Sequence, residues 1–234
     1  METKKKDIRA LTKEQLRTFF VSNGDKAFRG NQVYEWLWQK SAHSFDEMTN
    51  ISKATREMLE ENFVINHIKV DQMQRSNDGT IKNAVRLHDD LVVESVLIPT
   101  QTRTTACVSS QVGCSLDCRF CATARLKRMR NLNPDEIYDQ VVAIDNESRL
   151  YFDRPLSNIV FMGMGEPLMN YNNVIKAIDK ITSKEGLAMS PRRITVSTSG
   201  VPKMIKKMAD DEVRFKLAVS LHSAIDEVRT SIMP

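Results

Sequence analysis

The chain has 234 residues, 41% of them hydrophobic and 27% charged, with a formal net charge of only +4. That length suits one large domain with a smaller one, and no apolar run reaches the roughly 18 residues of a membrane-spanning helix. Four cysteines without a secretory leader do not indicate an oxidising compartment. We therefore expect a cytoplasmic protein with no membrane partner.

Residues 1–75 are predicted to form a small helical domain. Thr12 and Gln15 have the spacing of a capping box, which marks the start of a first helix. A second helix is predicted over 32–40 and a third from Ser52 onward. The side chains expected on the buried face of the second helix are Val33, Trp36 and Leu37.

Residues 76–100 are predicted to form a β-hairpin that links this domain to the rest of the chain. Two apolar runs, 81–87 and 91–98, flank the polar residues 88–90. Glu94 interrupts the second run, where alternation is poor. This carboxylate is either on the solvent face of the strand or buried for a functional reason, and both interpretations stay open.

From residue 101 to residue 234, short β-rich segments alternate with helical ones, which is the pattern of parallel βα units. The expected strands lie near 104–108, 157–162, 193–198 and 214–220, and the expected helices near 134–149, 171–184, 202–210 and from 226. Four such units do not close an eight-stranded barrel. We therefore predict an α/β fold, a partial (βα) barrel.

Each predicted strand is followed by a distinctive polar segment. The segments are the cysteine loop (residues 114–121), Gly163 to Pro167, residues 197–200 and residues 220–223. Chemistry in parallel βα barrels collects at the carboxyl ends of the strands. The four segments are therefore predicted to form one active site.

The cysteine loop carries Cys114, Cys118 and Cys121 with the spacing C-x-x-x-C-x-x-C. Three thiolates on so short a loop suit an iron–sulfur cluster in which one iron lacks a protein ligand. The alternative is a zinc site in which Cys107 is the fourth ligand. That spacing is unusual for structural zinc, whose ligand pairs usually come from two distant segments.

The basic residues are concentrated near this loop. Between residues 101 and 133 the chain has six basic residues and one acidic residue. Five of the basic residues lie on or just after the loop: Arg119, Arg125, Lys127, Arg128 and Arg130. These cations are either a solvated surface or a contact to the phosphates of a nucleic acid.

Taken together, these motifs resemble those of the radical S-adenosylmethionine (SAM) enzymes, whose signature has an aromatic residue where Phe120 stands. Residues 107–124, 161–170 and 194–202 are similar to the RlmN/Cfr group of RNA adenine methyltransferases, closest to its dual-specificity RlmN type. The likeness extends from about residue 10 to the last residue.

The resemblance implies a [4Fe-4S] cluster on Cys114, Cys118 and Cys121, and SAM bound beside it. The residues that would line the SAM site are Gly165, Glu166, Ser197, Ser220, Leu221 and His222. For His222 the alternative is a satisfied polar residue at the barrel rim. Ser197 and Ser220 could equally be caps of the helices that follow them.

The reaction implied by the resemblance adds a methyl group to carbon 2 of an adenosine in 23S ribosomal RNA and also in transfer RNA. A monomer would receive electrons from a donor such as flavodoxin, and the helical domain would contact RNA. Glu94 matches the carboxylate that removes the ring proton, and Cys107 matches the cysteine that releases the product by forming a disulfide.

One family feature is missing. The methyl-carrying cysteine of the family lies near the C-terminus, whereas all four cysteines here lie between 107 and 121. We therefore expect a chain truncated at its C-terminus. Methylation of carbon 8, an RNA- and SAM-binding fragment without methyl transfer, and a zinc-stabilised RNA-binding protein are the alternatives.

Overall fold

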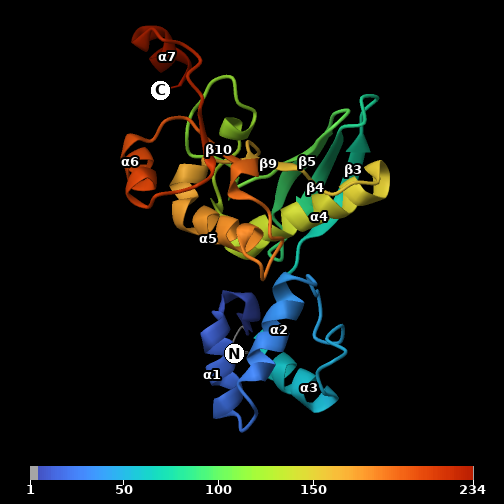
Figure 1. Cartoon of the computed structure of the whole chain (residues 1–234). Helices are drawn as coiled ribbons and strands as arrows, with labels where there is room; N and C mark the ends of the chain where they lie inside the picture. The colour runs from blue at the N-terminus through green and yellow to red at the C-terminus, as the bar shows by residue number, and fades with distance from the viewer. Residues whose placement is uncertain (1–4, 234) are drawn as a thin grey trace. The chain divides into compact units, whose positions relative to one another are not determined.

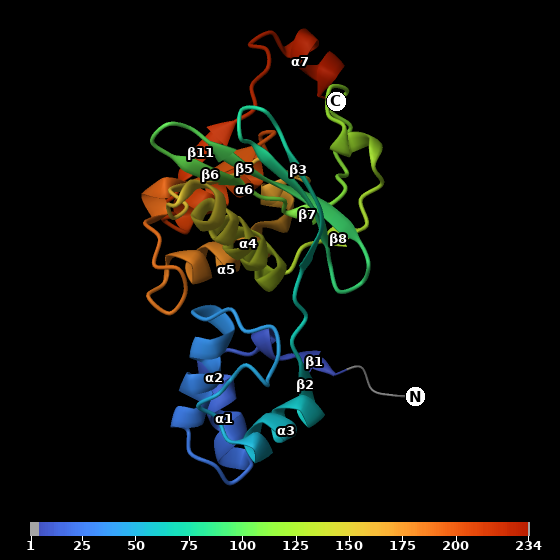
Figure 2. The ribbon, with the colours of Figure 1, turned by 90° about the vertical axis from the view of Figure 1, so that its right-hand side faces the viewer.

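The structure is a computed structural model, and it describes residues 5–233. The chain divides into two compact units (Figures 1 and 2). The first consists of residues 5–67 with 180–188, and the second of residues 68–179 with 189–233. The predicted helical domain corresponds to most of the first unit.

The first unit is built from three helices. Its elements are β1 (Lys6–Asp7), η1 (Ile8–Ala10), α1 (Lys13–Ser22), α2 (Phe28–Trp38), α3 (Lys53–Asn62) and β2 (Phe63–Val64). The capping box of Thr12 and Gln15 starts α1 as predicted, and Ser52 caps α3. Leu16, Phe20 and Leu59 are among the fully buried residues that form its core.

Helix α2 differs from its prediction in two ways. It begins at Phe28 instead of residue 32, and Gly30 lets this extra turn pack closely on α1. A Cβ at Gly30 would lie 2.6 Å from the backbone nitrogen of Arg17. Trp36, expected in the core, is only half-buried and donates to the side chain of Asn50, whereas Trp38 is 2% exposed.

A seven-stranded sheet forms the second unit, in the order β11-β10-β9-β6-β5-β4-β3. The strands are β3 (Lys69–Arg75), β4 (Ile81–Arg86), β5 (Val92–Pro99), β6 (Thr104–Cys107), β9 (Asn158–Phe161), β10 (Ile194–Thr198) and β11 (Lys216–Val219). Strands β6, β9, β10 and β11 are parallel, and β5 joins them antiparallel to β6. The four parallel strands confirm the predicted partial barrel.

The boundary expected at residue 75 needs a correction. Residues 69–75 were assigned to the helical domain, but they form β3, which pairs antiparallel with β4. Six of the seven β3 residues are exposed and the seventh is half-buried, so the strand has no alternating apolar pattern that a sequence reading could detect. The predicted hairpin, β4 with β5, is correct but lies within a three-stranded antiparallel extension of the sheet.

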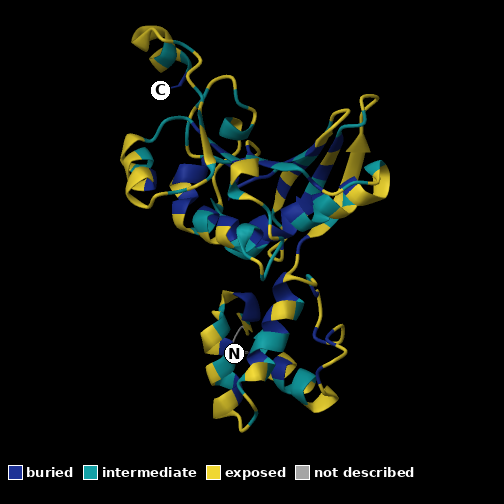
Figure 3. Ribbon diagram, viewed as in Figure 1, coloured by how far each residue is buried: buried dark blue, intermediate teal, exposed yellow. Residues whose placement is uncertain are grey.

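The helices of this unit are α4 (Pro134–Phe152), α5 (Tyr171–Thr182) up to residue 179, α6 (Pro202–Asp210) and α7 (Asp226–Ile232). Helices α4 and α5 lie along one face of the sheet (Figure 1), and Figure 3 shows buried residues on the facing sides of helix and strand. In β5, Val93 and Leu97 are buried while Glu94 and Ile98 are exposed. The sheet therefore has a helix-covered face and an open face. No helix in residues 5–233 is long and apolar enough to cross a membrane.

Candidate active site

The cysteine loop is held at its base by a short ladder. Residues of β7 (Gln111–Val112) pair antiparallel with β8 (Arg130–Asn131), so the chain returns to its starting point after the loop. Gly113 follows β7 with a φ of +72°, and a Cβ there would lie 2.4 Å from the carbonyl oxygen of Lys127. A glycine is therefore required where the loop leaves the ladder.

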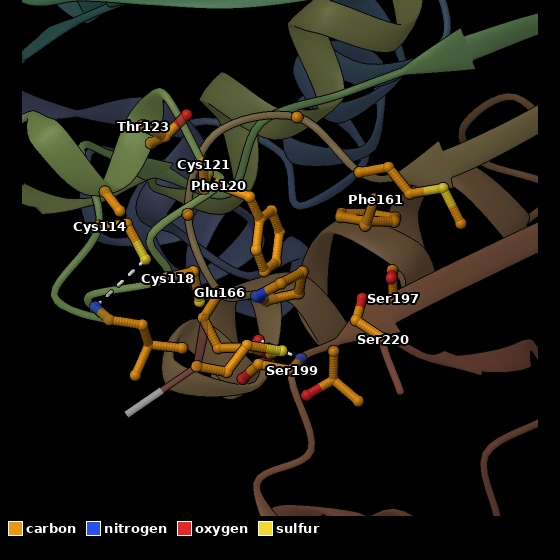
Figure 4. Close-up of a pocket in the computed structure, with 18 of the residues that line it drawn as sticks. Cys114, Cys118, Phe120, Cys121, Thr123, Phe161, Glu166, Ser197, Ser199 and Ser220 are labelled. Atoms are coloured by element: carbon orange, nitrogen blue, oxygen red, sulfur yellow. Dashed lines mark hydrogen bonds between the residues drawn. The ribbon is translucent and has the colours of Figure 1, made fainter. Parts of the chain in front are cut away.

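The three thiols of the loop face one cavity of about 310 Å³. Figure 4 shows Cys114, Cys118 and Cys121 on one side of it and Ser197 and Ser220 on the other. In the part of the chain that the structure describes, no three His, Cys, Asp or Glu side chains are arranged to hold a single metal ion. Three thiols around one cavity are a donor set that an iron–sulfur cluster can take.

The glycines after β9 let the backbone pack closely against the segment that follows β6. A Cβ at Gly163 would lie 2.7 Å from the hydroxyl oxygen of Ser109. Gly165 has a φ of +94°, and a Cβ there would lie 2.4 Å from the Cβ of Gln111. Both glycines also line the cavity. Close packing against the 108–111 segment is therefore one reason that these positions are glycine.

Glu166 links the loops after β9 and β10. Its side chain is buried, at 4% exposure, and both carboxylate oxygens accept backbone hydrogen bonds. Oε1 accepts from the N–H of Leu168 at 3.0 Å, and Oε2 accepts from the N–H of Ser199 at 2.8 Å. The carboxylate thus fixes the cavity wall and adds negative charge to it.

The cavity includes all but one of the residues expected to bind SAM. Ser197, Ser220 and His222 line it with Gly165 and Glu166, whereas Leu221 is 56% exposed and does not. The imidazole of His222 packs against the Phe120 ring with 4.3 Å between ring centroids. This contact joins the cysteine loop to the end of β11.

Sequence reasoning did not identify several residues that also line the cavity. They are Thr123, Ala124, Phe161, Met162 and Met233, which lie outside the four predicted segments. Most of them are immediate neighbours of predicted residues, so strand-end position could have indicated them. Met233 gave no such signal, because it comes to the cavity by way of α7 and not from the end of a strand.

Cys107 and Glu94 lie on the sheet and outside the cavity lining. Cys107 pairs with Val96, two residues from Glu94, so both side chains lie on the open face of the sheet. Glu94 is exposed and its carboxylate lies 2.5 Å from the ammonium of Lys82. Burial raises the pKa of the Cys107 thiol, although a backbone hydrogen bond of Met162 lowers it.

All four cysteines are free thiols. The structure therefore does not support the disulfide expected from the resemblance. Cys107 in β6 also does not join the three loop thiols at the cavity, and this separation removes the fourth ligand that the zinc interpretation needs.

An ion-pair network fixes the second strand of the ladder. Arg130 donates to Asp89 at 2.6 Å and to the buried Glu136 at 2.7 Å, and His88 lies 3.3 Å from Glu136. Arg130, one of the five predicted cations, is therefore engaged inside the protein. Arg125, Lys127 and Arg128 are exposed.

Comparisons with known proteins agree with this arrangement. The family described as "Radical SAM superfamily" matches residues 108–234, and "Ribosomal RNA large subunit methyltransferase N-terminal domain" matches residues 6–65. A "Probable dual-specificity RNA methyltransferase RlmN" from Christiangramia forsetii is 82% identical over this whole chain, which covers 66% of it. A protein of the same name from Flavobacterium johnsoniae is also 82% identical, with 67% of its length covered.

A solved structure supports the fold directly. The crystal structure of a radical SAM methyltransferase from Sphaerobacter thermophilus is 37% identical, with a TM-score of 0.88 over 98% of this chain and 67% of that one. The partial barrel with a three-cysteine loop thus defines the class, a radical SAM protein. The chain belongs to the radical SAM superfamily and, within it, to the RlmN family, and it spans about two thirds of the length of the curated relatives that it matches.

Proposed function

We propose that the chain forms the cluster- and SAM-binding part of an enzyme that methylates carbon 2 of adenosine in 23S ribosomal RNA and transfer RNA. The observation that carries the proposal is the cavity at the carboxyl ends of the parallel strands, with three thiols on one wall and glycine, carboxylate and serine groups on the other. The names of the relatives support an RNA substrate.

The donor set fits a [4Fe-4S] cluster. Cys114, Cys118 and Cys121 would hold three irons and leave the fourth open to the amine and carboxylate of SAM. When bound, the cluster supplies the electron that cleaves a carbon–sulfur bond of SAM. An electron donor such as flavodoxin would have to reach the cluster from outside the cavity.

The chain's own groups would orient SAM. The backbone at Gly165 reaches the cavity without a side chain, and Ser197 and Ser220 lie on the side of the cavity opposite the thiols (Figure 4). Glu166 would act mainly by fixing the wall, because both of its oxygens already accept backbone hydrogen bonds. The rings of Phe120 and His222 offer an apolar surface for the adenine base.

Glu94 and Cys107 would serve later steps. As a base, Glu94 would accept the ring proton of adenosine, and it would first have to release Lys82. Cys107 would become nucleophilic only after losing its proton, which burial opposes. Their shared place on the open sheet face supports a common role next to the substrate, since the face is not covered by α4 or α5.

The exposed cations after the cysteine loop would hold the RNA backbone. Arg125, Lys127 and Arg128 are exposed, and this stretch begins directly after cavity residues Thr123 and Ala124. Contacts of this kind fix the position of a nucleic acid without reading its sequence. The cavity would then select the base.

The experiment compares the chain with a fusion that adds the C-terminal third of the Christiangramia forsetii relative. After anaerobic iron–sulfide reconstitution, each is incubated with SAM, a reductant and unmodified ribosomal RNA, and the RNA hydrolysate is analysed by mass spectrometry. We expect 2-methyladenosine from the fusion. A product methylated at carbon 8, or no methylated adenosine from a fusion that binds its cluster, would contradict the proposal.

A further inference from the structure

Helix α7 joins two walls of the cavity. The backbone N–H of Arg119 in the cysteine loop donates to the carbonyl of Ile232 at 2.9 Å. From the middle of the same helix, the guanidinium of Arg229 donates to the carbonyl of Ser199, which follows β10. Met233, directly after the helix, is 8% exposed and lines the cavity. Figure 2 shows α7 next to the ribbon of the cysteine loop.

Arg229 is a cation without an ion-pair partner among the described residues. Its side chain makes a hydrogen bond to a neutral carbonyl, and no Asp or Glu between residues 5 and 233 forms a salt bridge with it. Arg229 is half-buried, and a guanidinium nitrogen lies 3.6 Å from the position that a Cβ at Gly200 would take. A half-buried, unpaired guanidinium interacts strongly with negative charge nearby.

The cavity concentrates negative charge. Thiols that hold iron do so as thiolates, and three of them would face the buried carboxylate of Glu166. Ser199, whose carbonyl accepts from Arg229, lines this cavity, and its backbone N–H donates to Oε2 of Glu166. The guanidinium of Arg229 therefore lies directly beside a wall of the cavity that the three thiols also line.

We propose that Arg229 compensates the negative charge of this site and so raises the reduction potential of the iron–sulfur cluster that the three thiols hold. The inference rests on the proposed function, because it needs that cluster. The potentials of such clusters depend on the net charge around them and on their solvent exposure. A fixed cation favours the reduced state, which carries one more negative charge. Arg229 is therefore a positioning residue for the cluster and not a group that reacts.

The test separates the charge of Arg229 from its hydrogen bond. Arg229→Gln removes the charge but keeps an N–H donor for the Ser199 carbonyl, whereas Arg229→Lys keeps both. The matched control is Arg192→Gln, which removes the same charge at an exposed position before β10, at the end of the strand away from the cavity. Each variant is reconstituted, its iron content is measured, and its midpoint potential is determined by a redox titration followed by electron paramagnetic resonance.

We expect a more negative potential in Arg229→Gln and potentials close to that of the unchanged chain in Arg229→Lys and Arg192→Gln. Loss of iron in Arg229→Gln with full retention in Arg229→Lys would also support the charge role. Equal potentials in all four proteins, equal shifts in the Gln and Lys variants, or loss of iron in both would overturn it. An unchanged chain that takes up no iron would instead contradict the proposed function itself.

Discussion

Gly165 has a positive φ, and there is no room for a side chain at its position in the cavity wall. Its φ of +94° strains any other residue, and a Cβ would overlap the Cβ of Gln111 at 2.4 Å. We expect Gly165→Ala to lower the free energy of unfolding by roughly 2–4 kcal/mol, measured by denaturant titration. The matched control is Gly79→Ala, with a φ of +86° but contacts no shorter than 3.3 Å, which should cost less. Equal losses in both variants would mean that backbone strain alone explains Gly165.

A second prediction at the residue scale concerns the cysteines. Changing Cys114, Cys118 and Cys121 together to Ala should abolish bound iron after reconstitution, because these thiols line the cavity. Cys107→Ala should retain nearly all of it, since Cys107 lies in β6 outside the cavity lining. Iron and sulfide analysis of the purified proteins measures both. If the single substitution Cys107→Ala abolished metal binding, the four-cysteine zinc site would be favoured.

The residues at the cavity that could be predicted from the sequence lie near or after the ends of strands, and those that could not belong to or follow helix α7. Cys114, Ser197 and Ser220 were predictable because the cysteine loop follows β6, Ser197 lies near the end of β10 and Ser220 directly follows β11, and the ends of neighbouring parallel strands meet. Arg229 and Met233 were not predictable. They reach the cavity region by way of α7, and the local sequence does not indicate that this helix packs beside the cysteine loop. The prediction for Leu221 was wrong in the other direction, because this residue lies within a matching motif but is exposed to solvent and does not line the cavity.

At the scale of elements, the network around Arg130 joins the β4–β5 turn to the base of the cysteine loop. Hydrogen bonding to Arg130 holds the pKa of the Asp89 carboxyl below its ordinary value, although burial opposes this. A carboxyl with a lowered pKa stabilises the fold above its unfolded-state pKa of about 3.9, and the benefit is lost as the pH falls below that value.

The lowered pKa of Asp89 predicts how the stability of the protein depends on pH. Between about pH 5 and pH 2 the unchanged chain should lose stability more steeply than Asp89→Asn, and at pH 7 the variant should be less stable by roughly 0.5–1 kcal/mol. Thermal unfolding followed by circular dichroism at several pH values measures this. The exposed pair Lys53 and Glu57 provides a control, because Glu57→Gln leaves the Arg130 network intact. Parallel pH curves for the unchanged chain and Asp89→Asn would contradict the assignment.

The exposed stretch after the cysteine loop gives a prediction about RNA. Reversing Arg125, Lys127 and Arg128 to Glu should weaken RNA binding and flatten its dependence on salt, because fewer counterions are released. Filter binding at several salt concentrations measures both quantities. Reversal of Lys203, Lys206 and Lys207 on α6 is the control for total charge. Unchanged affinity and salt slope in the first variant would mean that these cations are only a solvated surface.

Most of the element boundaries in the barrel could be predicted, while the first strand of the sheet could not. The helix starts at Pro134 and Pro202 carry clear signals, and the strands between them are short β-rich runs. Strand β3 has only two apolar residues, Val70 and Met73, and they do not alternate with polar ones. It is stabilised by pairing with β4, a contact that local sequence does not encode. The start of helix α2 at Phe28 also depends on a tertiary contact, because Gly30 allows its first turn to pack closely against α1.

At the scale of the whole molecule, the cavity groups and the groups for later steps are separate. The thiols and the residues proposed to bind SAM, apart from Leu221, lie around one cavity, whereas Glu94 and Cys107 lie on the open sheet face. On the proposed function, cleavage of SAM needs only the first set, whereas methyl transfer also needs the methyl-carrying cysteine that the family resemblance implies. All four cysteines of the chain lie between residues 107 and 121. The two activities should therefore separate in this chain.

The most direct test measures what the reconstituted and reduced chain does to SAM. We predict slow formation of 5′-deoxyadenosine and methionine in equal amounts, abolished by the triple cysteine variant, with no methylated adenosine in added RNA. Liquid chromatography with mass spectrometry detects all three products. A chain that binds iron and sulfide in full but leaves SAM intact, or one that methylates RNA on its own, would contradict this account.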